Sequence, residues 1–433
     1  MKNLKKLACL LLAVLMLMSV MTACGKSADG EAKKDNDLVE ISVLVGADTT
    51  IDGFEAVAAA AEEAIGVKVN IEQVPSNDLD NAVKTRCASG DMSDLLIYNS
   101  GALLKTLNPA DNFVDISGED FVKELDEAYV SSVTFDGATY GVPVGSSMVY
   151  GVLYNKAMYA EYNLEIPTTW QEFLDNCQVL KDAGEIAIVG SAKDQWTCQI
   201  VFLGDYYNLQ NADPNFPASY EAGEQKWATN PQALRGWEKT EETAPYYNED
   251  QLATTYDQAC EMLAEGQAAH YFMLTNAVGN IASLYDLETA NNIGAFPVLD
   301  DNGDNGVTLE ITSSLYANKN SENKDAVLKF MEYYVSAEAC QIHSEAEMAA
   351  GPYFVKGFAS TASQLGVVAD LQVYFDEGKT APALEFITSV KGEDCHIICQ
   401  EVSIGSISAL EGAEKYDLDC VKQAVQLGLD WPE

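Results

Sequence analysis

One segment of the sequence has the residue types and spacing of metal ligands. Cys395-His396-x-x-Cys399 places two thiols and an imidazole close together, beside Glu393 and Asp394. A structural zinc site needs four such ligands, and no second cluster along the chain supplies the missing ones. We therefore favour a buried helix face that carries two free thiols, and we expect no bound metal.

A second segment, Asp300–Gly306, is rich in the oxygen ligands that bind calcium. Its glycine falls one place too late for a calcium-binding loop. Ile311 would also occupy the position where such a loop carries a bidentate glutamate. A hairpin turn is the preferred interpretation.

The sequence contains no recognisable catalytic motif. His270, His343 and His396 lie in dissimilar settings, and none is accompanied by a nucleophile motif. The signatures G-x-S-x-G, P-loop and H-E-x-x-H are missing from the sequence. We expect a protein that is not an enzyme. Paired carboxylates of a glycoside hydrolase remain an alternative in so acidic a chain. An adhesin or scaffold is a third alternative, but the sequence has neither repeats nor a wall-anchoring tail.

The charge balance restricts the class of partner. The 433 residues carry 67 acidic and 25 basic side chains, a formal net charge of −42. Such a chain repels phosphate backbones and anionic lipid, which argues against nucleic-acid binding and surface-helix membrane binding. Arginine is favoured for gripping carboxylates and phosphates, and the chain has only Arg86 and Arg235, so we expect a neutral ligand.

The N-terminus has the features of an export signal. Lysines near the start precede the apolar run Leu7–Val20, which is shorter than the ~20 residues of a membrane-spanning helix. Residues 1–23 are therefore predicted to be a signal peptide. Met21–Cys24 resembles a lipobox, which predicts lipidation of Cys24 after cleavage. Residues 24–37 are charged and rich in small residues, which predicts a flexible tether outside the cell membrane.

Eight cysteines follow Cys24, and they are dispersed among mostly apolar residues. An even number in an exported protein permits disulfides but does not require them. They are Cys87, Cys177, Cys198, Cys260, Cys340, Cys395, Cys399 and Cys420.

The elements that must position any site begin with a β-α-β-α-β pattern over residues 39–98. It includes a helix from Gly53 to Ile65 that ends at Gly66, and it predicts a parallel, doubly wound sheet. Ligands of such sheets bind at the carboxyl ends of the strands, here Gly46–Thr49 and Tyr98–Gly101. The chain that follows the predicted tether has about 400 residues. This length is too great for one hydrophobic core and predicts two domains.

The centre of the chain predicts a hairpin and a long extended run. Asp136-Gly137 is a hairpin turn dipeptide, and residues 140–154 lack helical periodicity. Pro143 and Gly145 interrupt this run, so we expect the chain to change direction or sheet there. Thr169 and Glu172 predict a capping box that starts a helix at Trp170. Further on, we expect a buried helix over residues 200–209 and a helical tail from about residue 362 to the end.

Three segments in this region resemble one known family. YGVP, VLYNKAMY and EIPTTWQEF, in this order from Tyr140 to Phe173, resemble the extracellular solute-binding proteins of sugar ABC transporters, the maltose-binding-protein-like superfamily. Further similarity occurs at IGAFPV from Ile293 and at SLYANKNSENKDAVLKFMEYYVS from Ser314. The resemblance covers nearly all of residues 39–433.

The resemblance implies an α/β fold of the type II periplasmic-binding-protein class, with two lobes joined by three hinge crossings and a ligand cleft between them. Residues 38–147 and 315–350 would form the N-terminal lobe, and residues 148–314 and 351–433 the C-terminal lobe. The implied function is a substrate-binding lipoprotein that captures a sugar outside the membrane and delivers it to the permease of an ABC importer, acting as a monomer without a cofactor.

The resemblance also suggests ligand-binding residues. Trp196 would pack its ring on the C–H face of a sugar, and the Asp194 carboxylate would accept hydrogen bonds from hydroxyls. Relatives commonly carry tryptophan where this chain has Asn276, which weakens the expectation of a typical oligosaccharide and keeps a peptide or polyamine as the alternative ligand. The full set of candidates is Asp48, Tyr98, Asn99, Ser100, Asp194, Trp196, Asn276, Ser313 and Tyr353.

Overall fold

The computed structural model describes residues 38–47 and 49–431, and the chain from Leu38 onward forms one compact unit. The predicted signal peptide (1–23), the predicted tether (24–37) with Cys24, and Asp48 lie outside the described residues. Within the described part, no helix is both long enough and apolar enough to cross a membrane.

The first sheet has five strands in the order β2-β1-β3-β12-β6. Its strands are β1 (Val39–Gly46), β2 (Val67–Val74), β3 (Leu95–Tyr98), β6 (Gly141–Pro143) and β12 (Ser314–Ala317). β1 pairs in parallel with β2 and β3, which confirms the predicted β-α-β-α-β unit. β12 then pairs antiparallel with both β3 and β6, so the sheet is mixed rather than wholly parallel.

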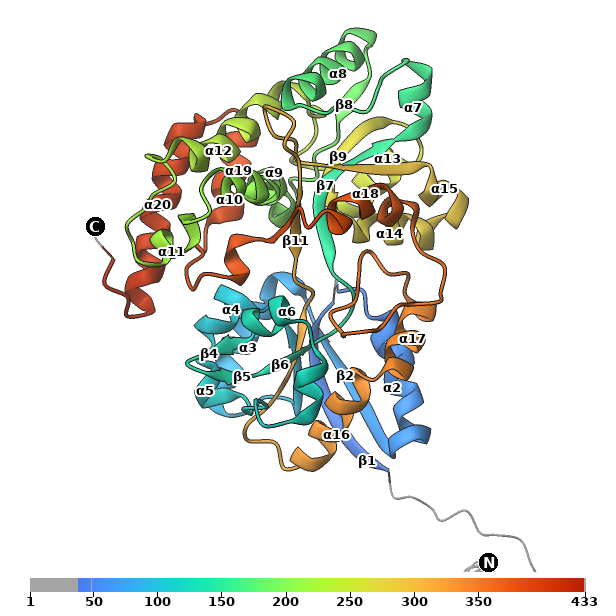
Figure 1. The fold of residues 1–433 in the computed structure, drawn as a ribbon, viewed down its shortest axis with the longest axis vertical. Coiled ribbons are helices and arrows are strands. Elements are labelled where there is room, and N and C mark those ends of the chain that lie inside the picture. The colour runs from blue at the N-terminus through green and yellow to red at the C-terminus, as the bar shows by residue number, and fades with distance from the viewer. Residues whose placement is uncertain (1–37, 48, 432–433) are drawn as a thin grey trace, which may run out of the picture. The chain divides into compact units, whose positions relative to one another are not determined.

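Helices from two distant parts of the chain cover this sheet (Figure 1). They are α2 (Asp52–Ile65), α3 (Ser76–Ser89), α4 (Gly101–Thr106), α5 (Pro109–Asn112), η2 (Asp120–Glu124), α6 (Glu127–Ser132), α16 (Lys324–Tyr334) and α17 (Ala337–Ala346). α2 buries Phe54, Val57 and Ala61 on one face, the spacing of an amphipathic helix. It ends where Gly66 adopts φ 70° and donates its N–H to the Ala61 carbonyl, as the sequence predicts. The hairpin of β4 (Thr134–Phe135) and β5 (Ala138–Thr139) is also present.

The second sheet has six strands in the order β13-β11-β7-β9-β8, with β10 also paired to β7. Its strands are β7 (Met148–Asn155), β8 (Ile186–Ile188), β9 (Ala268–Leu274), β10 (Ile293–Pro297), β11 (Val307–Glu310) and β13 (Thr380–Pro382). β7 is central because it pairs with β9 along one side and with β10 and β11 along the other.

The helices that accompany the second sheet come mainly from the middle and the end of the chain. They are α7 (Lys156–Glu161), α8 (Trp170–Ala183), η3 (Gln195–Gln199), α9 (Ile200–Gly204), α10 (Tyr206–Ala212), α11 (Phe216–Glu221), α12 (Pro231–Thr243), η4 (Ala244–Tyr246), α13 (Tyr256–Ala264), α14 (Asn276–Leu284), α15 (Leu287–Asn291), α18 (Gly366–Asp376), η5 (Leu384–Phe386), α19 (Cys395–Ser403) and α20 (Ala409–Gln426). The predicted capping box starts α8, where the Thr169 Oγ1 accepts from the Glu172 N–H and the Glu172 carboxylate accepts from the Thr169 N–H.

Three predictions for the chain after residue 199 need correction. The segment Asp300–Gly306 does not close a hairpin, because β10 and β11 pair with successive parts of β7 and not with each other. The helix expected over residues 200–209 is divided into α9 and α10 at Asp205, whose buried carboxylate pairs with Lys239 Nζ at 2.5 Å. The tail is not continuously helical, because β13 and η5 separate α18 from α19.

The thiol prediction is confirmed within the described residues. Cys395 and Cys399 are buried on α19, and all eight cysteines from Cys87 to Cys420 are free thiols. In the part of the chain described, no group of three or more histidine, cysteine, aspartate or glutamate side chains is arranged to hold a metal ion.

Candidate functional site

Within the described residues the chain passes between the two sheets at three places, which adjoin one another. These passages are residues 144–147, residues 311–313 and the segment around residues 349–353. The Val144 N–H donates to the Ser313 carbonyl at 2.9 Å, and the Ser147 N–H donates to the Pro352 carbonyl at 2.7 Å. Hydrogen bonds therefore join the three passages into one junction between the sheets. The lobe boundaries themselves stay a prediction.

Ser313 and Tyr353, two of the predicted residues, lie in this junction. The Tyr353 hydroxyl is 3.0 Å from His343 Nδ1, and the two rings meet edge to face. Burial lowers the pKa of His343 to about 4, so the imidazole is neutral at pH 7. A small cavity borders this pair and has room for about one water molecule.

The end of β3 and the segment that follows it bring three more predicted residues to the first sheet's side of the junction. Tyr98 is buried and its hydroxyl donates to Asp80 Oδ1 at 2.7 Å, while the Asn99 carbonyl accepts from Tyr316. Ser100 is only 2% exposed, yet its Oγ has no hydrogen-bond partner within the described residues. Ser100 therefore has a buried hydrogen-bonding group that the described residues leave unused.

Gly101 places this segment directly against the second sheet's half of the molecule. Its φ is 63°, and a Cβ atom there would lie 2.1 Å from the Glu385 carbonyl oxygen and 2.7 Å from the Phe386 Cα. A second contact across the halves is the exposed ion pair between Lys84 on α3 and Glu393 at 3.4 Å. Only a residue without a side chain fits so close an approach.

A cluster of charged side chains lies on the second sheet's side of this contact. Glu310 ends β11 and accepts a hydrogen bond from the Tyr150 hydroxyl on β7. Glu385 follows β13, and its Oε1 pairs with Lys391 Nζ at 2.6 Å. The other carboxylate oxygen of Glu385 is buried without a partner in the described residues.

Burial and mutual charge set the ionisation of this cluster. Burial raises the pKa of Glu310 to about 8, and the negative charge of Glu385 acts in the same direction. Burial opposes the charge on Lys391, but Glu385 and Glu310 together raise its pKa above the ordinary value. Glu385 and Lys391 thus form an ion pair beside a Glu310 carboxyl whose neutral form is favoured by burial.

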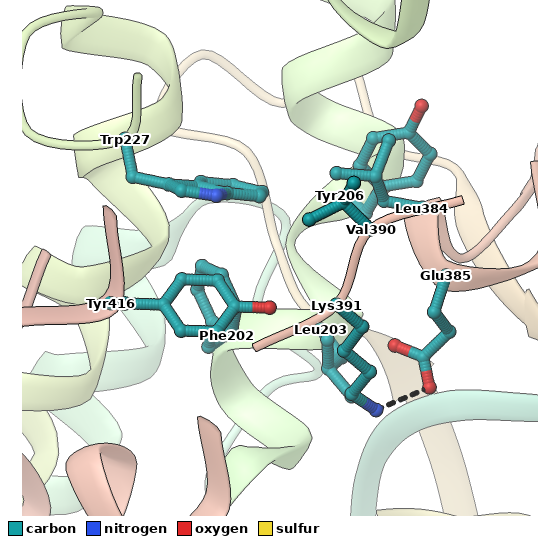
Figure 2. Close-up of a pocket in the computed structure, with 9 residues that line it drawn as sticks. All are labelled: Phe202, Leu203, Tyr206, Trp227, Leu384, Glu385, Val390, Lys391 and Tyr416. Carbon is teal, nitrogen blue, oxygen red and sulfur yellow. Dashed lines mark hydrogen bonds and ion pairs between the residues drawn. The ribbon is translucent and has the colours of Figure 1, made fainter. Parts of the chain in front are cut away.

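A cavity adjoins the ion pair of Glu385 and Lys391 (Figure 2). Its walls are mostly rings and aliphatic side chains, and Glu385 and Lys391 point toward one another at one end. The cavity has room for about one water molecule. It is lined by Phe202, Leu203, Tyr206, Trp227, Leu384, Glu385, Val390, Lys391 and Tyr416.

Asp194 and Trp196 lie together at the start of α13. Asp194 Oδ2 accepts from the Tyr256 N–H at 2.7 Å, so this carboxylate satisfies a backbone group of the first turn of α13. The Trp196 ring is 39% exposed and lies 5.6 Å from the Tyr256 ring. The exposed ring is thus held by an aromatic neighbour and leaves part of its surface uncovered.

Asn276 follows β9 and begins α14, beside the junction. The Thr275 hydroxyl accepts from the Val149 N–H at 3.1 Å and donates to the Ala350 carbonyl at 3.0 Å. The Asn276 Oδ1 is buried without a partner among the described residues. Asn280 donates to Asp257 at 3.1 Å, which links α14 to the helix on which Trp196 packs.

The structure therefore groups Ser100, Asn276, Ser313 and Tyr353 around the junction, with Asp194 and Trp196 on neighbouring elements. Glu310, Glu385 and Lys391 are not among the site residues predicted from the sequence. A charged residue that ends an apolar strand, as in VTLE of β11, was the available signal for Glu310. Glu385 and Lys391 come from a segment expected to be helical, so their pairing had no signal.

The sequence profile of the bacterial extracellular solute-binding proteins matches residues 47–339 of this chain. The chain belongs to this family. The matched range includes the segment after β3 and the first two passages. Of the site residues described above, Tyr353, Glu385 and Lys391 lie outside it. Members of the family bind solutes and are not enzymes, so the hydrolase alternative is set aside.

Individual relatives agree with this family and its fold. The chain is 25% identical over 367 residues to the multiple sugar-binding protein of Streptococcus mutans, covering 80% of this chain and 82% of that protein. The solved structure of RafE in complex with raffinose has a TM-score of 0.73 at 18% identity, covering 89% of this chain and 99% of RafE. A chitin oligosaccharide binding protein has a TM-score of 0.74 at 20% identity, covering 90% of this chain and 100% of that protein. The expected α/β fold of extracellular solute-binding proteins is confirmed.

Proposed function

We propose that this solute-binding protein is the lipid-anchored receptor of an ABC importer for a sugar or oligosaccharide. The main support is a set of buried polar atoms without partners at the junction of the two sheets. They are Ser100 Oγ, Ser147 Oγ, Asn276 Oδ1 and Glu385 Oε2. Buried polar groups without partners cost free energy, and a ligand with several hydroxyl groups would supply the missing hydrogen bonds.

The named relatives support the same class of ligand. A multiple sugar-binding protein, a raffinose complex and a chitin oligosaccharide binding protein all share the fold of this chain. Sugars present both hydroxyl groups and apolar C–H faces, which suits polar groups at the junction together with the partly uncovered ring of Trp196. The ligand would be enclosed when the two halves rotate toward each other about the three passages.

The proposed contacts are the predicted residues and the charged cluster beside them. Tyr98 and Asp194 already use a polar atom within the protein, so they would mainly shape the site or offer a second oxygen. The proposed ligand-binding set is Asp48, Tyr98, Asn99, Ser100, Asp194, Trp196, Asn276, Ser313 and Tyr353, with Glu385 and Lys391 added.

The remaining parts of the proposal concern the cell surface. Cys24 would carry a lipid after removal of residues 1–23, and residues 24–37 would tether the receptor to the cell membrane. The permease subunits would recognise the monomeric receptor in its closed form. The surfaces that flank the junction would provide this contact.

A receptor of the same fold for a polyamine or peptide is the second candidate. It is favoured by Asn276, which stands where relatives commonly carry tryptophan. The two candidate functions imply the same fold and the same closure of the two halves around a ligand. They differ only in the class of that ligand.

A thermal-shift screen of the full chain distinguishes them. The probes are raffinose, maltotriose, chitotriose and galactose, with spermidine and trialanine as the other classes. A ligand at a hundred times its Kd stabilises the folded state by ~2.7 kcal/mol, which raises the melting temperature by several degrees. We expect a shift with a sugar, recovered intact by chromatography. A shift only with spermidine or trialanine would overturn the sugar assignment.

A further inference from the structure

The Glu385–Lys391 pair has hydrogen-bonding capacity that the described residues leave unused. Glu385 is 8% exposed and its Oε2 has no partner, although Oε1 pairs with Lys391 Nζ at 2.6 Å. An ammonium group has three donors, and Glu385 is the one hydrogen-bond partner found for Lys391 in the described chain. The pair therefore offers one free acceptor beside free donors.

The surroundings of the pair are matched to a small group. The adjoining cavity has room for about one water molecule, and Phe202, Trp227 and Tyr416 form much of its wall (Figure 2). A single hydroxyl group occupies a similar space. Rings and aliphatic side chains around it would contact the carbon that carries the hydroxyl.

The position of the pair connects it to the proposed ligand site. The Glu385 backbone touches Gly101 across the two halves, and Gly101 follows Ser100, whose Oγ is also buried without a partner. Glu310 lies beside the pair on β11, at the start of the second passage. A ligand held at the junction would thus have one end within reach of Glu385 and Lys391.

We propose that Glu385 and Lys391 bind one hydroxyl group of the ligand, which donates to Glu385 Oε2 and accepts from Lys391 Nζ, and that they restrict the receptor to neutral, polyhydroxylated ligands. This inference rests on the proposed function. A hydroxyl is both donor and acceptor, whereas an ammonium ligand cannot accept from Lys391 and a carboxylate ligand cannot donate to Glu385. Each charged ligand would also face a like charge at close range.

Neighbouring ionisation supports this selectivity. The raised pKa of Glu310 keeps its carboxyl neutral at pH 7, so the ion pair is not unbalanced by a second negative charge. The polar groups near Glu385 are Lys391, Glu310 and the hydroxyls of Tyr150 and Tyr416. With this balance, the subsite attracts neither sign of charge.

The test is isothermal titration calorimetry on the full chain with the sugar that gives the largest thermal shift among raffinose, maltotriose and chitotriose. Lys391→Met and Glu385→Gln should each weaken binding at least tenfold, the loss of a charge-assisted hydrogen bond. The double variant Glu385→Gln with Lys391→Met carries no unpaired charge and should fold and show the same loss. Lys415→Met removes the lysine of an ion pair with Glu401 between α19 and α20 and serves as the matched control, with affinity changed less than twofold.

Spermidine tests the charge rule. Wild type should not bind it, and Lys391→Met, which leaves Glu385 without its counter-charge, should gain measurable binding. Sugar affinity within twofold of wild type in the folded double variant would overturn this inference and leave the proposed function standing. Wild-type binding of spermidine, with none of the three sugars bound, would overturn both.

Discussion

Trp196 differs from Trp170, Trp227 and Trp237 because it is partly exposed, whereas they are buried. Those three rings are at most 5% exposed, whereas Trp196 is 39% exposed and is supported by Tyr256. An exposed aromatic ring held by a neighbour loses little conformational freedom when a ligand packs on it. This residue is therefore the best single test of sugar stacking.

Trp196→Ala is expected to weaken sugar binding by ~1–2 kcal/mol, measured by calorimetry, because a stacked ring contributes about this much. Tyr285→Ala is the matched control, since Tyr285 is also an exposed aromatic residue but lies at the end of α14. Unchanged affinity in a folded Trp196 variant would remove this residue from the site.

The Glu310 carboxyl gives the stability of the protein a specific pH dependence. Its pKa rises from 4.5 to about 8 because of burial and the nearby charge of Glu385. Between these values the folded state binds more protons than the unfolded state, so the free energy of unfolding falls as pH rises through this window. Tyr150, Glu385 and Lys391 are the polar groups around this carboxyl.

Glu310→Gln removes this titration and keeps an acceptor for Tyr150. Urea denaturation at about pH 5 and about pH 9 should therefore show the variant gaining stability relative to wild type at the higher pH. An equal difference between variant and wild type at both pH values would mean that Glu310 titrates normally.

Residue-level prediction from sequence succeeds where the signal is local. Asn276 and Ser313 follow recognisable strands, so their places beside the junction could be anticipated. The Glu385 backbone approaches Gly101 only because β13 joins the second sheet next to β11, a pairing that connects distant segments. No local pattern encodes such a contact. The composition around residue 385 predicts a helix instead of the strand β13.

At the scale of elements, the contact between α4 and η5 controls how closely the two halves approach. Gly101→Ala should weaken sugar binding at least tenfold, because a methyl group at 2.1 Å from the Glu385 carbonyl prevents this approach. Calorimetry measures the affinity, and small-angle scattering with the sugar bound should show a less compact receptor.

Gly90→Ala separates this clash from backbone strain. Gly90 has φ 73°, similar to the 63° of Gly101, but no atom lies within 4 Å of its Cβ position. The Gly90→Ala variant should lose a free energy of unfolding similar to that lost by Gly101→Ala, but it should keep its affinity for the sugar. Equal loss of affinity in both variants would attribute the effect to strain alone.

Element boundaries could be predicted where a cap or a stop is encoded locally. α2 ends at Gly66 and α8 begins after the Thr169–Glu172 capping box, both as expected. The errors occur where a tertiary contact overrides periodicity. The break between α9 and α10 falls at Asp205, whose side chain pairs with the distant Lys239, and β13 pairs with the edge of β11.

At the scale of the whole molecule, the anchor predicted from Met21–Cys24 can be tested by fractionation. Cys24→Ser should move the receptor from the membrane fraction to the soluble fraction, because the serine hydroxyl cannot replace the lipidated thiol. Circular dichroism and sugar affinity should stay as in wild type. Retention of the variant in the membrane fraction would contradict a lipid anchor at this position.

The place of β12 has a consequence for how the chain folds. β12 lies between β3 and β6, but β6 ends at Pro143 and β12 begins only at Ser314, after most of the second sheet has been made. The first sheet therefore cannot close before Ser314–Ala317 has been synthesised, and its formation depends on contacts of high sequence separation, which are slow to form. A chain whose first sheet stays open through the synthesis of β7 to β11 is well suited to translocation as an unfolded thread, with folding left to the far side of the membrane.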